Sequence, residues 1–218
     1  GSGLLPAALL PLTPFFCSAL SRMGTTKRDY AEMAQRIDAY TGGVGFSTHA
    51  RTRFDDTGNC VPFLAFNGKC LLRNQEPMFD IIQELLHHSD FSNLTRMKSI
   101  LLEYRAGLEA MVIHSGHRLA ISLAARNLSA TRMLSEIWSG VHKLQTIKRL
   151  TDDITERDLS ALSADLTAIG NALITQNNFQ MALIGEESAL TDARSCAQSL
   201  FDGFKPGKED GFKAPDIT

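Results

Sequence analysis

The feature that most constrains this fold is an apolar segment followed by an amphipathic segment and a double glycine, all within the first 50 residues. Residues 5–23 are nearly all apolar, which predicts a buried helix. Residues 27–40 carry apolar side chains at helical spacing and predict a second helix, with Thr26 as its cap. Gly42 and Gly43 are expected to end that helix, and a strand follows at once.

A β-hairpin is expected directly after the double glycine. Residues 44–54 alternate between two sets of side chains, one mostly apolar and one polar, which is the period of a strand. Residues 55–59 have the composition of a turn, and residues 60–72 form the return strand. The alternation indicates a sheet with one covered face and one face that is open to water.

The rest of the chain predicts helices and one short strand, so the expected class is α/β in the broad sense, α+β in detail. Ser115 and Gly116 break or bend the chain, and Thr155 pairs with Asp158 as a helix cap. The expected helices cover 74–88, 94–114, 117–127, 130–150, 156–174 and 187–201, and the buried strand covers 179–184. We expect one domain over 1–202 and a Gly- and Pro-rich linker over 203–218 that leads to a further domain.

Composition excludes several classes of function. The net charge is −2 with acids and bases mixed, so no basic stripe favours nucleic acid as a partner. No apolar run reaches the length that spans a bilayer, and the apolar start lacks the basic flank of a signal peptide. The cysteines stand far apart, which favours buried free thiols in a reducing compartment: Cys17, Cys60, Cys70 and Cys196.

The histidines do not form a convincing zinc motif. Catalytic zinc takes three protein ligands and leaves one position open. His114 and His117 have a suitable spacing, but Gly116 lies between them and no glutamate does. The other candidates are adjacent or isolated in the sequence: His87, His88, His49 and His142. For each of them a surface or hydrogen-bonded structural role is the better interpretation.

Nucleophilic and acid–base chemistry find no support either. The chain lacks a Gly-x-Ser-x-Gly elbow, and Cys17 and Cys60 lie in apolar segments that make a thiol inert. The glycines at 42–45 follow a helix and enter a strand, which is the reverse of a phosphate-binding loop. The paired carboxylates fit turns and helix starts: Asp55 and Asp56, Asp152 and Asp153, Glu186 and Glu187.

Four segments, 9–25, 40–47, 66–69 and 115–125, carry a resemblance to a known family in their order and spacing. They resemble the third, non-catalytic domain of the pitrilysin/insulinase-type zinc metallopeptidases, in the presequence protease branch, and the resemblance runs from residue 9 to about 202. In that family the active helix carries His-x-x-Glu-His. The spacing back from Gly24 places the two histidines at Phe15 and Ala19 and the glutamate at Ser18, and none of these can bind zinc or activate water.

The resemblance implies a catalytically silent copy of a protease domain. We therefore expect no catalytic, metal-binding or cofactor-binding residue in this chain, and no substrate-binding residue is assigned. It implies a metallohydrolase-like fold of the pitrilysin/LuxS type, with an antiparallel-rich mixed sheet packed on helices. Such domains usually begin with strands before the first helix, and those strands are expected to be missing here or cut away. An exposed sheet edge favours pairing with another chain, so a homodimer is also an expectation.

The implied parent is a four-domain zinc metalloendopeptidase that degrades unfolded peptides in a closed chamber, with zinc in its first domain. This chain would form chamber wall, with the other domains and peptide substrates as its partners. The alternative is a structural subunit of the same fold, such as a respiratory-complex core protein without protease activity. Bacterial cytoplasm and an organelle matrix both fit the composition.

Overall fold

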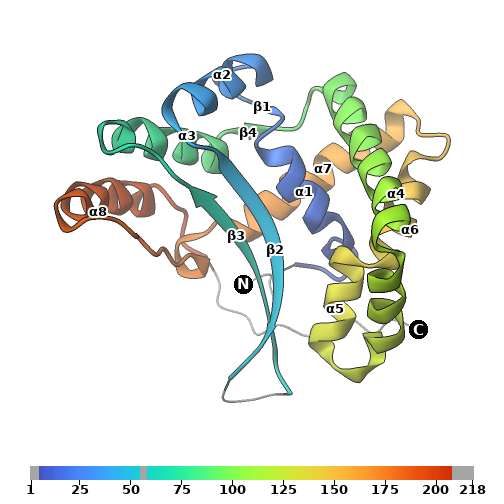
Figure 1. Cartoon of the computed structure of the whole chain (residues 1–218). Helices are drawn as coiled ribbons and strands as arrows, with labels where there is room; N and C mark the ends of the chain where they lie inside the picture. The colour runs from blue at the N-terminus through green and yellow to red at the C-terminus, as the bar shows by residue number, and fades with distance from the viewer. Residues whose placement is uncertain (1–4, 55–57, 208–218) are drawn as a thin grey trace.

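The computed structural model describes residues 5–54 and 58–207 and shows helices packed around a long β-hairpin (Figure 1). Within these residues the strands form two antiparallel pairs, β1 with β4 and β2 with β3. The predicted α+β class is confirmed, while the specific pitrilysin/LuxS-type fold stays a prediction. The elements are η1 (Leu10–Leu12), α1 (Thr13–Leu20), β1 (Gly24–Thr25), α2 (Tyr30–Tyr40), β2 (Val44–Thr52), β3 (Cys60–Gly68), η2 (Leu72–Asn74), α3 (Gln75–His87), β4 (Ser89–Asp90), α4 (Leu94–Ala125), η3 (Arg126–Leu128), α5 (Ala130–Ser139), α6 (Val141–Thr151), α7 (Glu156–Leu173), η4 (Gln176–Asn178) and α8 (Glu187–Asp202).

The helices cover the hairpin from several sides. In Figure 1, α3 and α8 lie on one side of it and α4, α5 and α6 on the other, with α1 and α7 behind. The short helix α1 is central, because it contacts β2, α4 and α7. Its apolar side chains belong to one large hydrophobic core that also takes in residues of α4, α5, α7 and α8.

The opening helix is shorter than predicted. Residues 5–23 do not form one helix: a 3₁₀ turn, η1, leads into α1, and Leu20 is its last residue. A proline stands in the first turn of each, Pro11 in η1 and Pro14 in α1. Proline has no N–H to donate, so it suits a helix start and divides the segment into two short elements.

The second helix begins three residues later than predicted. Asp29, not Thr26, is the N-cap of α2, and it forms a capping box with Glu32. The Asp29 side chain accepts from the backbone N–H of Glu32 at 2.9 Å, and the Glu32 side chain accepts from the N–H of Asp29 at 3.1 Å. Thr26 instead donates its backbone N–H to the carbonyl of His88. After α2, Gly43 adopts φ 111°, a conformation that glycine reaches without strain.

The predicted hairpin is confirmed. Strands β2 and β3 pair in register from Val44 opposite Gly68 to Thr52 opposite Cys60. Phe46 and Phe66 lie opposite each other with ring centroids 5.9 Å apart, and both pack against the core. The turn prediction falls partly on residues 55–57, including Asp55 and Asp56, which lie outside the described residues.

The expected break or bend at Ser115 and Gly116 is present: Ser115 has a non-helical φ of −137° and ψ of 26°, which kinks α4 between the two predicted helices. One helix boundary differs from the prediction. The expected single helix 130–150 is two helices, α5 and α6, separated at Gly140. Thr155 and Asp158 do form the predicted capping box at the start of α7.

The end of the chain also departs from expectation. The predicted strand 179–184 belongs to no sheet within the described residues, although its side chains alternate between half-buried and exposed. Phe204, inside the predicted linker, is only 5% exposed and packs against His87 and Phe179. The domain boundary at 202 stays a prediction.

Candidate functional site

The helix α1 contains the three residues that the sequence analysis aligned with the zinc-binding motif of the family. Phe15 and Ala19 are 0% exposed, and Ser18 is half-buried. The Phe15 ring meets Tyr104 of α4 edge-on, with centroids 5.4 Å apart. Phenylalanine and alanine offer no electron pair to a cation, so this face of α1 functions as hydrophobic core. Among the described residues no group of three or more His, Cys, Asp or Glu side chains is arranged to hold a metal ion.

The buried Cys17 thiol of α1 lies near two half-buried groups, the Tyr104 phenol of α4 and the Lys143 ammonium group of α6. Burial raises the pKa of the Cys17 thiol to about 12, and the nearby Lys143 charge opposes this only in part. Burial also raises the pKa of Tyr104 and lowers that of Lys143, whose Nζ lies 4.9 Å from the centre of the Tyr104 ring. At neutral pH Cys17 is therefore a protonated thiol, which is a poor nucleophile.

The structure scatters the histidines. His114 and His117 are both exposed on α4, on either side of the kink. His87 is half-buried beside the Phe204 ring, and its pKa is lowered chiefly by burial and further by His88. His49 lies on the hairpin, where its ring stacks on Phe63 with centroids 5.2 Å apart. These positions do not bring the histidines together.

Glu136 is a buried polar group that the sequence analysis missed. Its carboxylate, on α5, is 0% exposed and accepts from the backbone N–H of Val141 at 2.7 Å. It also accepts from the N–H of His142 at 3.3 Å, contacts the His142 Nδ1 at 3.2 Å and accepts from the Ser122 hydroxyl. It caps the first turn of α6 from the preceding helix. The only sequence signal was a glutamate four residues before a glycine.

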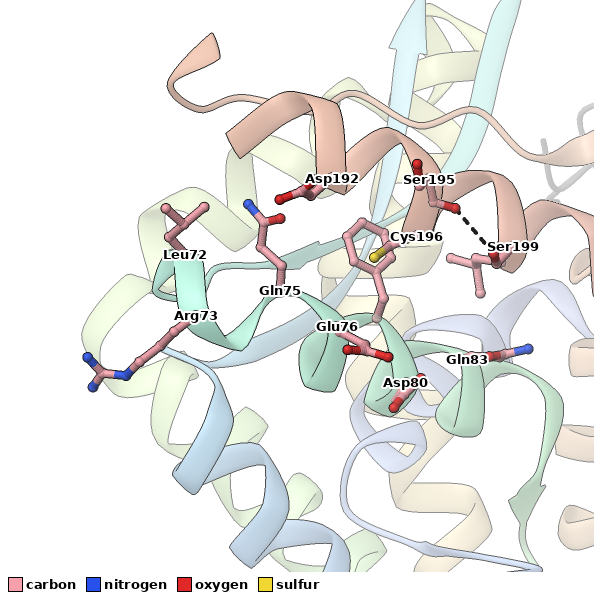
Figure 2. Close-up of a pocket in the computed structure, with 12 residues that line it drawn as sticks. Leu72, Arg73, Gln75, Glu76, Asp80, Gln83, Asp192, Ser195, Cys196 and Ser199 are labelled. Carbon is pink, nitrogen blue, oxygen red and sulfur yellow. Dashed lines mark hydrogen bonds between the residues drawn. The ribbon is translucent and has the colours of Figure 1, made fainter. Parts of the chain in front are cut away.

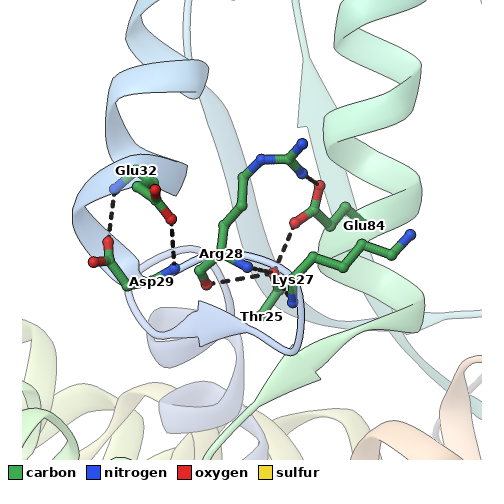
Figure 3. A network of polar contacts seen from close by, with 6 residues as sticks. All are labelled: Thr25, Lys27, Arg28, Asp29, Glu32 and Glu84. Atoms are coloured by element: carbon green, nitrogen blue, oxygen red, sulfur yellow. Dashed lines mark hydrogen bonds and ion pairs between the residues drawn. The ribbon is translucent and has the colours of Figure 1, made fainter.

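A second missed network joins the loop before α2 to α3 (Figure 3). The Thr25 hydroxyl donates to Glu84 at 2.7 Å, and Arg28 forms an ion pair with the same carboxylate. Thr25 also accepts the N–H of Arg28 at 3.0 Å, which closes a tight turn. The Glu84 side chain is buried, and its partners all come from one loop, so the network is structural.

An acidic pocket of about 460 Å³ lies between α3 and α8. Figure 2 shows Glu76 and Asp80 on α3 opposite Asp192 and Cys196 on α8. The pKa of Cys196 is raised by burial first and then by these three carboxylates. The pocket can attract a positively charged group.

A larger groove of about 860 Å³ runs along the hairpin. Its two walls are strand β3 and the segment 177–184, and Met78 and Ile82 of α3 also contribute to its lining. No sequence pattern predicted this groove, because it depends on how the segment 177–184 lies beside β3.

The comparisons with known proteins settle the family. A sequence model for the domain described as peptidase M-16C associated matches residues 2–150, and the chain belongs to this family. It is similar to the mitochondrial presequence protease of Danio rerio, with 29% identity over 188 residues, which cover 86% of this chain and 18% of that protein. It is also similar to presequence protease 1, chloroplastic/mitochondrial, of Arabidopsis thaliana, with 25% identity over 200 residues that cover 92% of this chain and 18% of that protein.

A bacterial relative shares the same stretch. The chain is 24% identical over 183 residues to Protein HypA of Clostridium perfringens, which covers 84% of this chain and 18% of that protein. The chain thus spans about a fifth of the length of these relatives. Across the described residues, no helix combines the length and the apolar character needed to cross a membrane.

Proposed function

We propose that this chain is a non-catalytic domain of a zinc-dependent metalloendopeptidase that degrades unfolded peptides, and that it forms part of the wall of the peptide chamber. The zinc would lie in another domain of the same polypeptide. The observation that carries the proposal is the burial of Phe15 and Ala19 in α1, packed on β2, within a chain of this peptidase-associated family. In this proposal α1 is the counterpart of the zinc helix, and with core side chains at the ligand positions it supports a chamber without catalysing.

The proposed partners follow from the relatives. Three of them are named presequence proteases, from Danio rerio, Yarrowia lipolytica and Arabidopsis thaliana, and in each the matched part is 18% of the protein. The partners of this chain would therefore be the remaining domains of the same polypeptide and the peptide being cleaved. The four cysteines are all free, which fits a reducing compartment such as bacterial cytoplasm or an organelle matrix.

Zinc binding and hydrolysis by the isolated chain test the proposal. The chain is incubated with one equivalent of zinc, gel-filtered, and analysed for metal by mass spectrometry. It is also assayed with a quenched fluorescent peptide that has no stable structure. We expect less than about 0.1 zinc per chain and no hydrolysis, because catalytic zinc needs three protein ligands. One zinc per chain, or turnover that a chelator stops, would overturn the proposal.

A further inference from the structure

The first five residues of the predicted linker fold back onto the domain. We call residues 203–207 the strap; they follow α8 and lie beside the residues that come after α7. The backbone N–H of Gln176 donates to the carbonyl of Lys205 at 2.8 Å. The side-chain amide of Asn177 donates to the carbonyl of Gly207, also at 2.8 Å. The strap is therefore held by hydrogen bonds from outside itself, at its centre and at its end.

The Phe204 side chain anchors the strap in the hydrophobic core. It is only 5% exposed, and its ring lies 4.7 Å from that of Phe179 and 6.1 Å from that of Phe201, measured between centroids. It also meets the imidazole ring of His87, the last residue of α3, with centroids 4.8 Å apart. Of these three aromatic partners, only the histidine can gain or lose a charge near neutral pH.

The surroundings of His87 suit a neutral imidazole. Its Nε2 atom is buried and has no hydrogen-bond partner among the residues that the structure describes. A neutral ring can carry its proton on Nδ1 and leave Nε2 as an unused acceptor, whereas an imidazolium carries a proton on both nitrogens. Protonation would thus create a buried, charged N–H group without an acceptor, which is costly.

The charges around His87 oppose protonation as well. Within the described part of the chain, the charged groups that act on this ring are Lys205 of the strap, Lys27 of the loop before α2, and His88. Burial lowers the pKa of His87 most, and these three positive charges lower that pKa further. A proton on His87 therefore repels Lys205, which belongs to the strap itself.

We propose that the strap is acid-sensitive: it stays docked while His87 is neutral, and it opens when His87 binds a proton. Opening exposes the ring to water and separates it from Lys205, so the open form binds the proton more tightly than the docked form. Docking is thus unaffected well above pH 6.5, the ordinary pKa of histidine, and weakens as the pH falls below that value. The docked strap fixes the direction of the chain up to residue 207, and opening releases it. This response requires neither zinc nor peptidase activity.

Hydrogen–deuterium exchange tests the strap directly. Exchange is measured by peptide mass spectrometry at about pH 7.5 and about pH 5, in residues 1–218 and in the full-length gene product, and each rate is divided by that of an unstructured peptide at the same pH. We expect residues 174–178 and 203–207 to exchange at least about threefold faster at the lower pH, because one linked proton shifts an equilibrium by up to about tenfold per pH unit. The amides of α7 serve as the internal reference and should not change.

Three variants assign the response to one ring. His87→Phe keeps a ring against Phe204 but cannot bind a proton, so its corrected rates should be the same at both pH values. The matched control His88→Gln removes the neighbouring histidine and should keep the pH response. Phe204→Ala removes the anchor, so both segments should exchange fast at either pH. By reciprocity, His87 should then bind its proton at least about threefold more tightly than in the wild type, as measured by NMR titration of the ring.

Each contrary result overturns the proposal in its own way. Equal corrected rates at both pH values in the wild type remove the acid response. A response that survives in His87→Phe, or one that disappears in His88→Gln, places the titrating group elsewhere. Acceleration of the α7 amides by the same factor means that acid loosens the whole domain and not the strap. An unchanged proton affinity of His87 in Phe204→Ala breaks the link between the ring and docking, and this measurement holds even where His87→Phe does not fold.

Discussion

Replacing Gly140 with alanine should destabilise the protein strongly, through Glu136. A methyl group at position 140 would overlap both carboxylate oxygens of Glu136. That carboxylate cannot easily move, because it is fully buried and held by Val141, His142 and Ser122. Gly140 itself has φ −98°, which alanine adopts freely, so the cost comes from the clash and not from backbone strain.

The magnitude follows from the two effects that the methyl group causes. Forcing an extra group into a packed site costs roughly 1–3 kcal/mol. Displacing the carboxylate leaves buried donors unsatisfied, at roughly 1–3 kcal/mol more. We therefore expect Gly140→Ala to lower the free energy of unfolding by about 2–6 kcal/mol. Urea unfolding, followed by circular dichroism at 222 nm, measures it.

Two variants control this prediction. Gly107 lies on the exposed side of α4 with open space around it, so Gly107→Ala should stabilise the protein by about 0.5–1 kcal/mol. In a Glu136→Ala background the cost of Gly140→Ala should largely disappear, because the clashing carboxylate is gone. The reasoning is wrong if the free energies of unfolding of Gly140→Ala and Gly107→Ala differ by less than about 0.5 kcal/mol. It is also wrong if Gly140→Ala lowers the free energy of unfolding equally in the wild-type and Glu136→Ala backgrounds.

Two further predictions concern the buried polar groups. Glu84→Gln should lower the free energy of unfolding by about 1–3 kcal/mol, because it removes the charge that pairs with Arg28 inside a buried network. The control Glu103→Gln, which removes an exposed ion pair, should change it by less than about 1 kcal/mol. Equal effects of the two variants would refute the structural role of Glu84. Cys17 should make the protein less stable as pH rises from 9.0 to about 12, because its folded pKa is raised and only the unfolded chain loses the proton in that window. The free energy of unfolding should fall by up to about 1.4 kcal/mol per pH unit in this window. The fall should be shallower in Cys17→Ala, which keeps Lys143, whose lowered pKa makes the protein more stable as pH rises. A wild-type curve parallel to that of Cys17→Ala would contradict the buried thiol.

Local patterns predicted the elements whose causes are local. The hairpin follows from strict alternation between 44 and 54, and α7 begins where its capping box stands at Thr155 and Asp158. The two glycine positions show the limit. Gly116 has open space around it and directly follows the kink at Ser115, whereas at Gly140, the C-cap of α5, the buried carboxylate of Glu136 fills the space that a side chain would need.

The candidate site shows the same limit. Burial of Phe15 and Ala19 was predicted from the apolar character of residues 5–23. The networks around Glu84 and Glu136 could not be predicted, because an isolated glutamate in a helix reads as a solvated surface residue until its partners are known. The segment 179–184 was predicted as a strand from its alternation. It joins no sheet in the part of the chain that the structure describes, because strand formation needs a partner as well as a pattern.

The most direct test of the proposed function compares the full-length gene product with this chain in one assay. Both are given the same quenched fluorescent peptide of about 25 unstructured residues, with and without a zinc chelator, at equal molar concentration. We predict hydrolysis by the full-length protein that the chelator abolishes, and no hydrolysis by residues 1–218. A full-length protein without chelator-sensitive hydrolysis, or comparable turnover by this chain alone, would contradict the assignment of a silent domain in an active zinc peptidase.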